Sequence, residues 1–185
     1  MKKIMALSLF VLMLSCTSDK TETVTVKNKY SIELPSFLSE AKGLHDMASL
    51  QYQNAFKEFY IVIIDEPKEE FANAAKVTTE FTPDFNGYYQ ILRGSLEASI
   101  KNGVFTDTKD TQINGLKAKT FTLTGKADEI PVFYDIAYVE GNDRFYQIVT
   151  WTIESSKEKF KEPMDKIIAS FKEIGSGKSS NRSLK

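Results

Sequence analysis

The sequence contains few residues that support thiol or imidazole chemistry. It has one cysteine, Cys16, and one histidine, His45, among 185 residues. A single cysteine excludes a disulfide within the chain and a cysteine-based zinc cluster, and a single histidine excludes the histidine pair of a typical zinc site. A chain of this length buries a sufficient core without such cross-links.

His45 also lacks a catalytic context. It lies between Leu44 and Asp46 in a polar segment, and no nucleophile-elbow pattern nominates a serine that it could activate. We therefore expect a loop histidine that is hydrogen-bonded to Asp46, with a catalytic role as the alternative.

An excess of one charge and glycine-rich motifs are absent as well. The chain has 24 Lys and Arg residues against 25 Asp and Glu residues, without a dense basic stripe, so no nucleic-acid partner is expected. Its glycines are scattered and form neither a phosphate loop nor a dinucleotide fingerprint. We therefore expect no cofactor.

The only long apolar run lies at the N-terminus. Lys2 and Lys3 precede a mainly apolar run from Ile4 to Leu14, and Ser15 stands directly before Cys16. A charged start, about eleven mainly apolar residues and a small residue at a cleavage point are typical of a secretory signal. Such a run is too short to span a hydrocarbon core of about 30 Å.

Cysteine at the cleavage point makes this segment resemble a bacterial lipoprotein signal, although Met13 stands where leucine is usual. The resemblance implies that residues 1–15 are removed and that Cys16 is diacylated. Residues 16–23 would then be a lipidated cysteine and a polar tether, whose last seven residues reach at most about 25 Å. The alternative is a buried N-terminal helix with an inert thiol, but no cap precedes it and only polar residues follow it.

Alternating and fully apolar segments predict an antiparallel sheet. Alternation over residues 23–26 and 30–34 predicts a hairpin, and a weaker strand is predicted over 47–54. The segments 59–64, 132–139 and 145–153 are apolar on both alternating faces, which indicates that both faces are covered. The short turn at 140–143 makes the last two pair antiparallel, and a strand over 116–124 should lie beside them.

Three helices are predicted to cover the sheet. A short helix is expected over 71–78, after Pro67. Apolar residues at steps of three and four predict a second over 85–100, which Asn102-Gly103 would stop. The third is predicted from 155 to 171, with Ser155 and Glu158 as a capping box and with a kink or an irregular first turn due to Pro163.

The order of these elements resembles the PsbP/Mog1-like family. The resemblance is carried by the segment Tyr30 to Pro35 followed by Phe37, by Phe145 to Thr152, and by Ile167 to Lys172. It implies an α+β fold, a three-layer α/β/α sandwich with a central antiparallel sheet, over residues 24–174. The polar residues 175–185 would be a disordered tail.

The family includes photosystem accessory proteins, a nuclear GTPase-binding protein and envelope lipoproteins of unassigned role. It shares no catalytic residue set, so the resemblance assigns no functional residue to this chain.

Acidic residues gather where the buried strand at 59–64 meets the first predicted helix. Asp65, Glu66, Glu69 and Glu70 offer oxygen ligands of the kind that calcium prefers. Their spacing does not reproduce a calcium loop with its central glycine, and glutamates at a helix start also stabilise the helix dipole. These four residues are weak candidates for a metal site, and a solvated acidic face is the favoured interpretation.

Five aromatic residues lie on the strands that are expected to be buried, namely Tyr60, Tyr134, Tyr138, Tyr146 and Trp151. Large rings normally fill core volume. Any ring that packing does not need could line a ligand pocket or an interaction patch.

Together these observations predict a non-enzymatic lipoprotein of the cell envelope, attached to the membrane through lipidated Cys16, whose domain binds or supports a protein partner. Thr17 after the cysteine, in place of the aspartate of inner-membrane lipoproteins, favours the outer membrane. The alternatives are a lipoprotein that binds a small molecule or a metal and, last, a hydrolase that works without histidine.

Overall fold

The computed structural model describes residues 20–77 and 80–175. The expected signal segment, Cys16, Thr78 and residues 176–185 of the expected tail lie outside the described residues. The strands are β1 (Thr21–Val26), β2 (Tyr30–Pro35), β3 (Ser39–Glu40), β4 (Ala48–Asn54), β5 (Phe59–Pro67), β6 (Lys101–Phe105), β7 (Lys109–Ile113), β8 (Leu116–Ala127), β9 (Ile130–Glu140), β10 (Arg144–Ile153) and β11 (Lys172–Glu173). The helices are α1 (Lys68–Ala75), α2 (Phe85–Ser99), the 3-10 turn η1 (Glu154–Ser156) and α3 (Lys157–Ser170).

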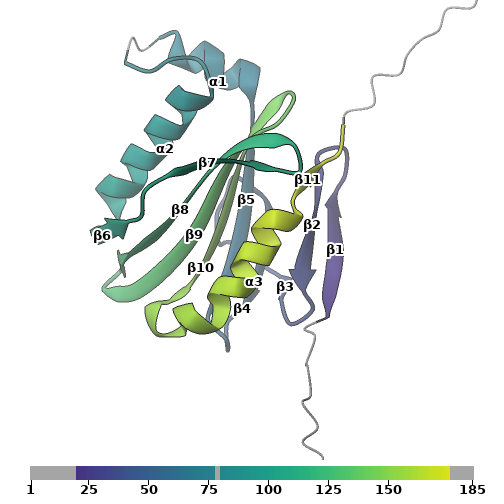
Figure 1. Ribbon diagram of the computed structural model, residues 1–185, viewed down its shortest axis with the longest axis vertical. Coiled ribbons are helices and arrows are strands. Elements are labelled where there is room, and N and C mark those ends of the chain that lie inside the picture. The colour runs from purple at the N-terminus through teal and green to yellow at the C-terminus, as the bar shows by residue number, and fades with distance from the viewer. Residues whose placement is uncertain (1–19, 78–79, 176–185) are drawn as a thin grey trace, which may run out of the picture.

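A large antiparallel sheet lies at the centre of the described chain (Figure 1). Its strands follow the order β3-β4-β5-β10-β9-β8-β6, and β7 also pairs with β8. Strands β1, β2 and β11 form a second, smaller sheet. The predicted hairpin at 23–34 is therefore confirmed, and it belongs to this second sheet. It begins earlier than predicted, because Thr21 pairs with Pro35, so residues 21–23 belong to β1 and not to the expected tether.

Strand β5 shows why both faces of the large sheet need cover. Ile61 and Ile63 are fully buried on one face, against α3 and the small sheet. Val62 is buried on the opposite face, where Phe71 of α1 and Tyr88 of α2 belong to a second core cluster. The predicted three-layer α/β/α sandwich is confirmed, with the small sheet sharing the layer of α3.

The start of α3 differs from the prediction. The chain leaves β10 in an extended conformation at Ile153 and makes the tight turn η1, so α3 begins at Lys157. Its N-cap is Ser156, whose side chain makes no capping hydrogen bond. The capping box of Ser155 and Glu158 is therefore wrong. An irregular first turn is present as η1, and Pro163 lies inside α3.

The segment after α2 also differs from the prediction. The helix ends at Ser99, but Asn102 and Gly103 lie within β6, at a bulge in its pairing with β8. A Cβ atom on Gly103 would lie 2.9 Å from the ring of Phe105 and 3.2 Å from Leu123. The glycine therefore serves close packing at a bulged edge strand rather than a helix end.

Among the described residues, no helix is both long and apolar enough to cross a membrane.

Candidate functional site

The four acidic candidates for a metal site do not converge. Asp65 and Glu66 are neighbours on β5, so their side chains point to opposite faces of the sheet. Glu69 and Glu70 lie in the first turn of α1. Within residues 20–77 and 80–175, no group of three or more His, Cys, Asp or Glu side chains is placed to hold a metal ion.

Asp65 is instead bound by two cations. Its side chain is 2% exposed, accepts a hydrogen bond from Lys29 Nζ at 3.0 Å and forms an ion pair with Arg144. Burial alone would raise the pKa of Asp65, but hydrogen bonds from Lys29 and Ser49 and the charges of Lys29 and Arg144 outweigh it and lower the pKa. This ion pair fixes the β1–β2 turn to the large sheet.

Two carboxyl groups have raised pKa values, which is the property that a hydrolase without histidine would need. Burial raises the pKa of Asp135 to about 6, although Lys161 lies 3.1 Å from its carboxylate. Burial and the charge of Glu70 raise the pKa of Glu66. Asp135 faces α3 and Glu66 points to the opposite face, beside Phe145, so the two groups do not form a catalytic pair.

His45 is an exposed loop residue whose Nδ1 accepts a hydrogen bond from the amide of Met47 at 3.2 Å. The expected partner was Asp46, one residue earlier. Because the imidazole closes its own loop onto the backbone, its position is explained by local structure.

The five aromatic residues divide into two groups. Tyr138 and Tyr146 are 1% exposed and belong to the core. Tyr60, Trp151 and Tyr134 are half-buried and occupy matching positions on β5, β10 and β9. We call these three residues the aromatic row. The rings of Tyr60 and Trp151 stack with centroids 5.2 Å apart, and those of Trp151 and Tyr134 lie 6.1 Å apart.

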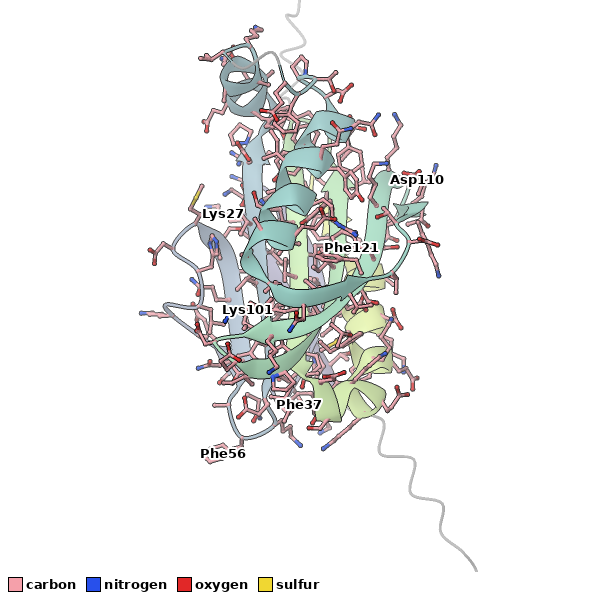
Figure 2. The ribbon with its side chains drawn as sticks, turned by 90° about the vertical axis from the view of Figure 1, so that its left-hand side faces the viewer. Lys27, Phe37, Phe56, Lys101, Asp110 and Phe121 are labelled. Carbon is pink, nitrogen blue, oxygen red and sulfur yellow. The ribbon has the colours of Figure 1, made fainter. Side chains whose placement is uncertain are left out.

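The aromatic row lies on the face that α1 and α2 cover, at the margin of their core cluster, against which Tyr134 packs. Tyr88, early in α2, stacks on Phe145 of β10, and Arg93 lies over Phe121 of β8, so the helix crosses the sheet obliquely (Figure 2). Phe145 is near the β9–β10 turn, whereas the aromatic row lies at the far end of the same strands. The far ends of β5, β10 and β9 therefore remain partly open.

The chemistry of the row suits contact rather than catalysis. The hydroxyl of Tyr60 donates a hydrogen bond to Glu58 at 2.7 Å, and burial together with this carboxylate raises the pKa of Tyr60 to about 12. Burial and the charge of Asp128 raise the pKa of Tyr134. Both phenols stay protonated at neutral pH, so neither serves as a base or a nucleophile.

An apolar hollow continues from the row. Ile153 is the next residue after Trp151 on this face of β10, and it lines a hollow of about 490 Å³ together with Ile130, Pro131 and residues 154–155. Ile130 is 55% exposed, which is unusual for a large aliphatic side chain. The row and the hollow together form a partly exposed apolar surface.

No protein-family model matches the chain, and no curated protein matches it. Solved structures do match. The solution structure of cyanobacterial PsbP (CyanoP) from Synechocystis sp. PCC 6803 aligns with a TM-score of 0.57 at 11% sequence identity, covering 86% of this chain and 96% of that chain. The fold is PsbP-like.

A second structure supports the PsbP-like fold. LpqN of Mycobacterium tuberculosis, described as involved in cell envelope biogenesis, aligns with a TM-score of 0.54 at 10% identity, covering 84% of this chain and 91% of that chain. At such low identity the likeness concerns the backbone and carries no side-chain roles. Any functional site of this chain therefore depends on its own side chains.

The sequence contained part of the signal for the aromatic row. Tyr134 and Trp151 each lie six residues from the Glu140–Phe145 pair at the end of the β9–β10 hairpin, so the hairpin places them side by side. What the sequence did not reveal is how α2 crosses the sheet, and that path decides which rings stay uncovered.

Proposed function

We propose that this protein is an exported lipoprotein, anchored through Cys16, whose PsbP-like domain is a non-enzymatic accessory module that binds a protein partner. The observation that carries the proposal is the aromatic row, whose rings are only partly buried and do not serve as catalytic groups. Tyr and Trp are enriched in protein interfaces, where they supply most of the binding energy.

The arrangement of the rings favours a protein over a small molecule. The rings of Tyr60 and Trp151 stack at an interplanar angle of 12°, so each ring covers one face of the other and no ligand fits between them. The row does not line the hollow of about 780 Å³ between α3 and the β1–β2 hairpin, which is lined by residues such as Lys159, Glu162 and Lys166. An extended surface of this kind suits a protein surface better than a small ligand, which binds in a concave site.

The anchor rests on the lipoprotein-like signal at residues 1–16. LpqN, which shares the fold, is described as involved in cell envelope biogenesis, and an accessory role in the envelope is in keeping with that description. The acidic residues support a non-enzymatic role. Asp65 is neutralised by cations, and the two carboxyl groups with raised pKa values, those of Asp135 and Glu66, lie on opposite faces of the sheet.

The test is crosslinking in cells that produce the tagged full-length protein, followed by purification and identification of the partner. We expect one envelope protein to be enriched with the wild type. Trp151→Ala should weaken its binding by tenfold or more, because truncating an interface aromatic residue costs about 2 kcal/mol. Cys16→Ala should abolish the capture, because the chain then leaves the membrane.

Val104→Ala is the matched control, since it removes an exposed apolar side chain from β6, away from the row. It should leave the capture unchanged. Thermal unfolding of each variant confirms that the fold is retained. Equal capture by wild type and Trp151→Ala would show that the aromatic row does not bind the partner. The absence of any specific partner would contradict the accessory role.

A further inference from the structure

One end of the molecule combines the start of the described chain with an exposed aromatic side chain. The carbonyl of Lys20, directly before β1, accepts a hydrogen bond from the amide of Ser36 at 2.7 Å. The next residue, Phe37, accepts a hydrogen bond from Asn54 Nδ2 at 2.8 Å, and Lys57 Nζ lies 5.3 Å from the centre of its ring. The start of β1 and the β4–β5 turn therefore lie at the same end (Figure 1).

Phe56, in the β4–β5 turn, is fully exposed, at 103% of its reference area. Phe37, at the same end, packs on Phe59 and Phe160, whereas Phe56 points away from the molecule (Figure 2). Transfer of a phenyl ring from water into an apolar environment lowers the free energy. Phe56 is therefore available for contact with an apolar environment outside this chain.

The turn holds Phe56 outward by its own hydrogen bonds. The amide of Lys57 donates to Asn54 Oδ1 at 3.0 Å and to the carbonyl of Asn54 at 3.1 Å, and the amide of Glu58 donates to the carbonyl of Ala55. Glu58 has a φ of 51°, and its carboxylate accepts a hydrogen bond from Tyr60. The ring is thus presented on a closed turn rather than on a long loop.

The expected lipid anchor, Cys16, lies close in sequence to this end of the domain. Cys16 precedes Lys20 by four residues, which span at most about 14 Å when fully extended. A lipid on Cys16 would therefore hold this end of the domain close to the membrane surface. The ammonium groups of Lys20, Lys57 and Lys159 belong to the same end and can interact with anionic headgroups, beside the carboxylates of Glu22 and Glu58.

We propose that Phe56 enters the membrane interface and, with Lys57 beside it, fixes the orientation of the domain on the bilayer. This inference rests on the anchor in the proposed function, because the lipid brings the turn to the surface. The lipid supplies the binding and Phe56 supplies a second point of contact, which restricts rotation about the tether. The partner-binding row would then keep a constant direction relative to the membrane.

The test uses the lipidated full-length protein on vesicles of phosphatidylethanolamine and phosphatidylglycerol. Because the thioether occupies the sulfur of Cys16, the variant Ala55→Cys provides one free thiol beside Phe56 for an environment-sensitive fluorophore. We expect a several-fold rise in emission on the vesicles and strong quenching by spin-labelled lipids. The matched control is Val77→Cys, whose position is 86% exposed and lies two residues after the end of α1, a helix at the other end of the molecule (Figure 1).

Phe56→Ser in the Ala55→Cys background should remove most of the rise in emission while the protein still floats with the vesicles. The outcomes separate the two proposals. If the lipidated protein floats but the label at residue 55 behaves like the label at residue 77, the contact of Phe56 is overturned and the anchor stands. If the chain is not lipidated and does not float, both the anchor and this inference are overturned.

Discussion

Thr150 and Thr152 lie on the same face of β10 and are both fully buried, yet their hydroxyl groups are in different situations. The hydroxyl of Thr150 donates to the carbonyl of Asp135 at 3.0 Å. The hydroxyl of Thr152 is buried without a hydrogen-bond partner among the described residues, and its register neighbours are Phe59 and Phe133. A buried hydroxyl without a partner costs free energy that an apolar group of the same shape does not.

At the residue scale we therefore expect Thr152→Val to raise the free energy of unfolding by about 1 kcal/mol. Thr150→Val, the matched control on the same strand, should lower it by about 1 kcal/mol, because it removes a buried hydrogen bond. Urea unfolding of the two variants measures both changes. Equal losses in the two variants would show that Thr152 has a partner after all.

At the element scale, α2 and α3 begin differently. Asp84 caps α2, because its carboxylate accepts hydrogen bonds from the amides of Asn86 and Gly87. These bonds, with one from the hydroxyl of Thr82, lower the pKa of Asp84, the bond from Gly87 having the largest effect. Ser156 precedes α3 without a capping bond.

We expect Asp84→Ala to lower the free energy of unfolding by about 1 kcal/mol at pH 7, whereas Ser156→Ala should change it by less than about 0.5 kcal/mol. Since the folded-state pKa of Asp84 is depressed, its stabilisation is fully present above the unfolded value near 3.9 and is lost as pH falls through the folded pKa. Unfolding curves at pH 7 and at pH 3 should show the gap between wild type and Asp84→Ala closing. A gap independent of pH would contradict the role of the charged carboxylate.

At the scale of the whole molecule, Asp65 joins the two sheets. Lys29 comes from the β1–β2 turn and Arg144 from the start of β10, and both bind the buried carboxylate on β5. Near the β9–β10 turn, Glu173 of β11 accepts hydrogen bonds from the amide of Asn142 and from the hydroxyl of Tyr146. The small sheet is thus attached to the large one by polar contacts as well as by the core.

We expect Asp65→Asn to lower the free energy of unfolding by about 3 kcal/mol, because it leaves two cations without their partner. The depressed pKa of Asp65 means that this stabilisation is present above pH 4 and disappears as pH falls through the folded value. Glu129→Gln, which affects an exposed ion pair with Lys101, is the control and should change stability by less than about 0.5 kcal/mol. Chemical unfolding over a pH series tests both statements, and a cost for Asp65→Asn as small as the control's would exclude a structural ion pair.

Much of the architecture was predictable because the patterns that specify it are local. Strands β5, β9 and β10 are apolar on both faces, and that alone requires layers on both sides of a sheet. Strands β6 and β7 were missed because their residues are mostly polar or exposed, so pairing with β8 rather than their own pattern makes them strands.

The candidate site was also predictable only in part from the sequence. Alternation placed Tyr60, Tyr134 and Trp151 on strands, but it could not tell these half-exposed rings from the buried Tyr138 and Tyr146. The difference depends on where α2 crosses the sheet, which is a relation between segments far apart in the chain. Asp65 is a similar case, since its partners Lys29 and Arg144 are 36 and 79 residues away.

The sequence by itself determined the layered α+β architecture and the expectation of a lipid anchor at Cys16, because hydrophobic periodicity and a signal segment are properties of contiguous residues. Only the tertiary structure decided which aromatic rings are only partly buried, that Asp65 is neutralised by cations, and that Phe56 shares an end of the molecule with the start of β1. Burial and charge pairing depend on neighbours brought together by the fold, and no local pattern specifies them.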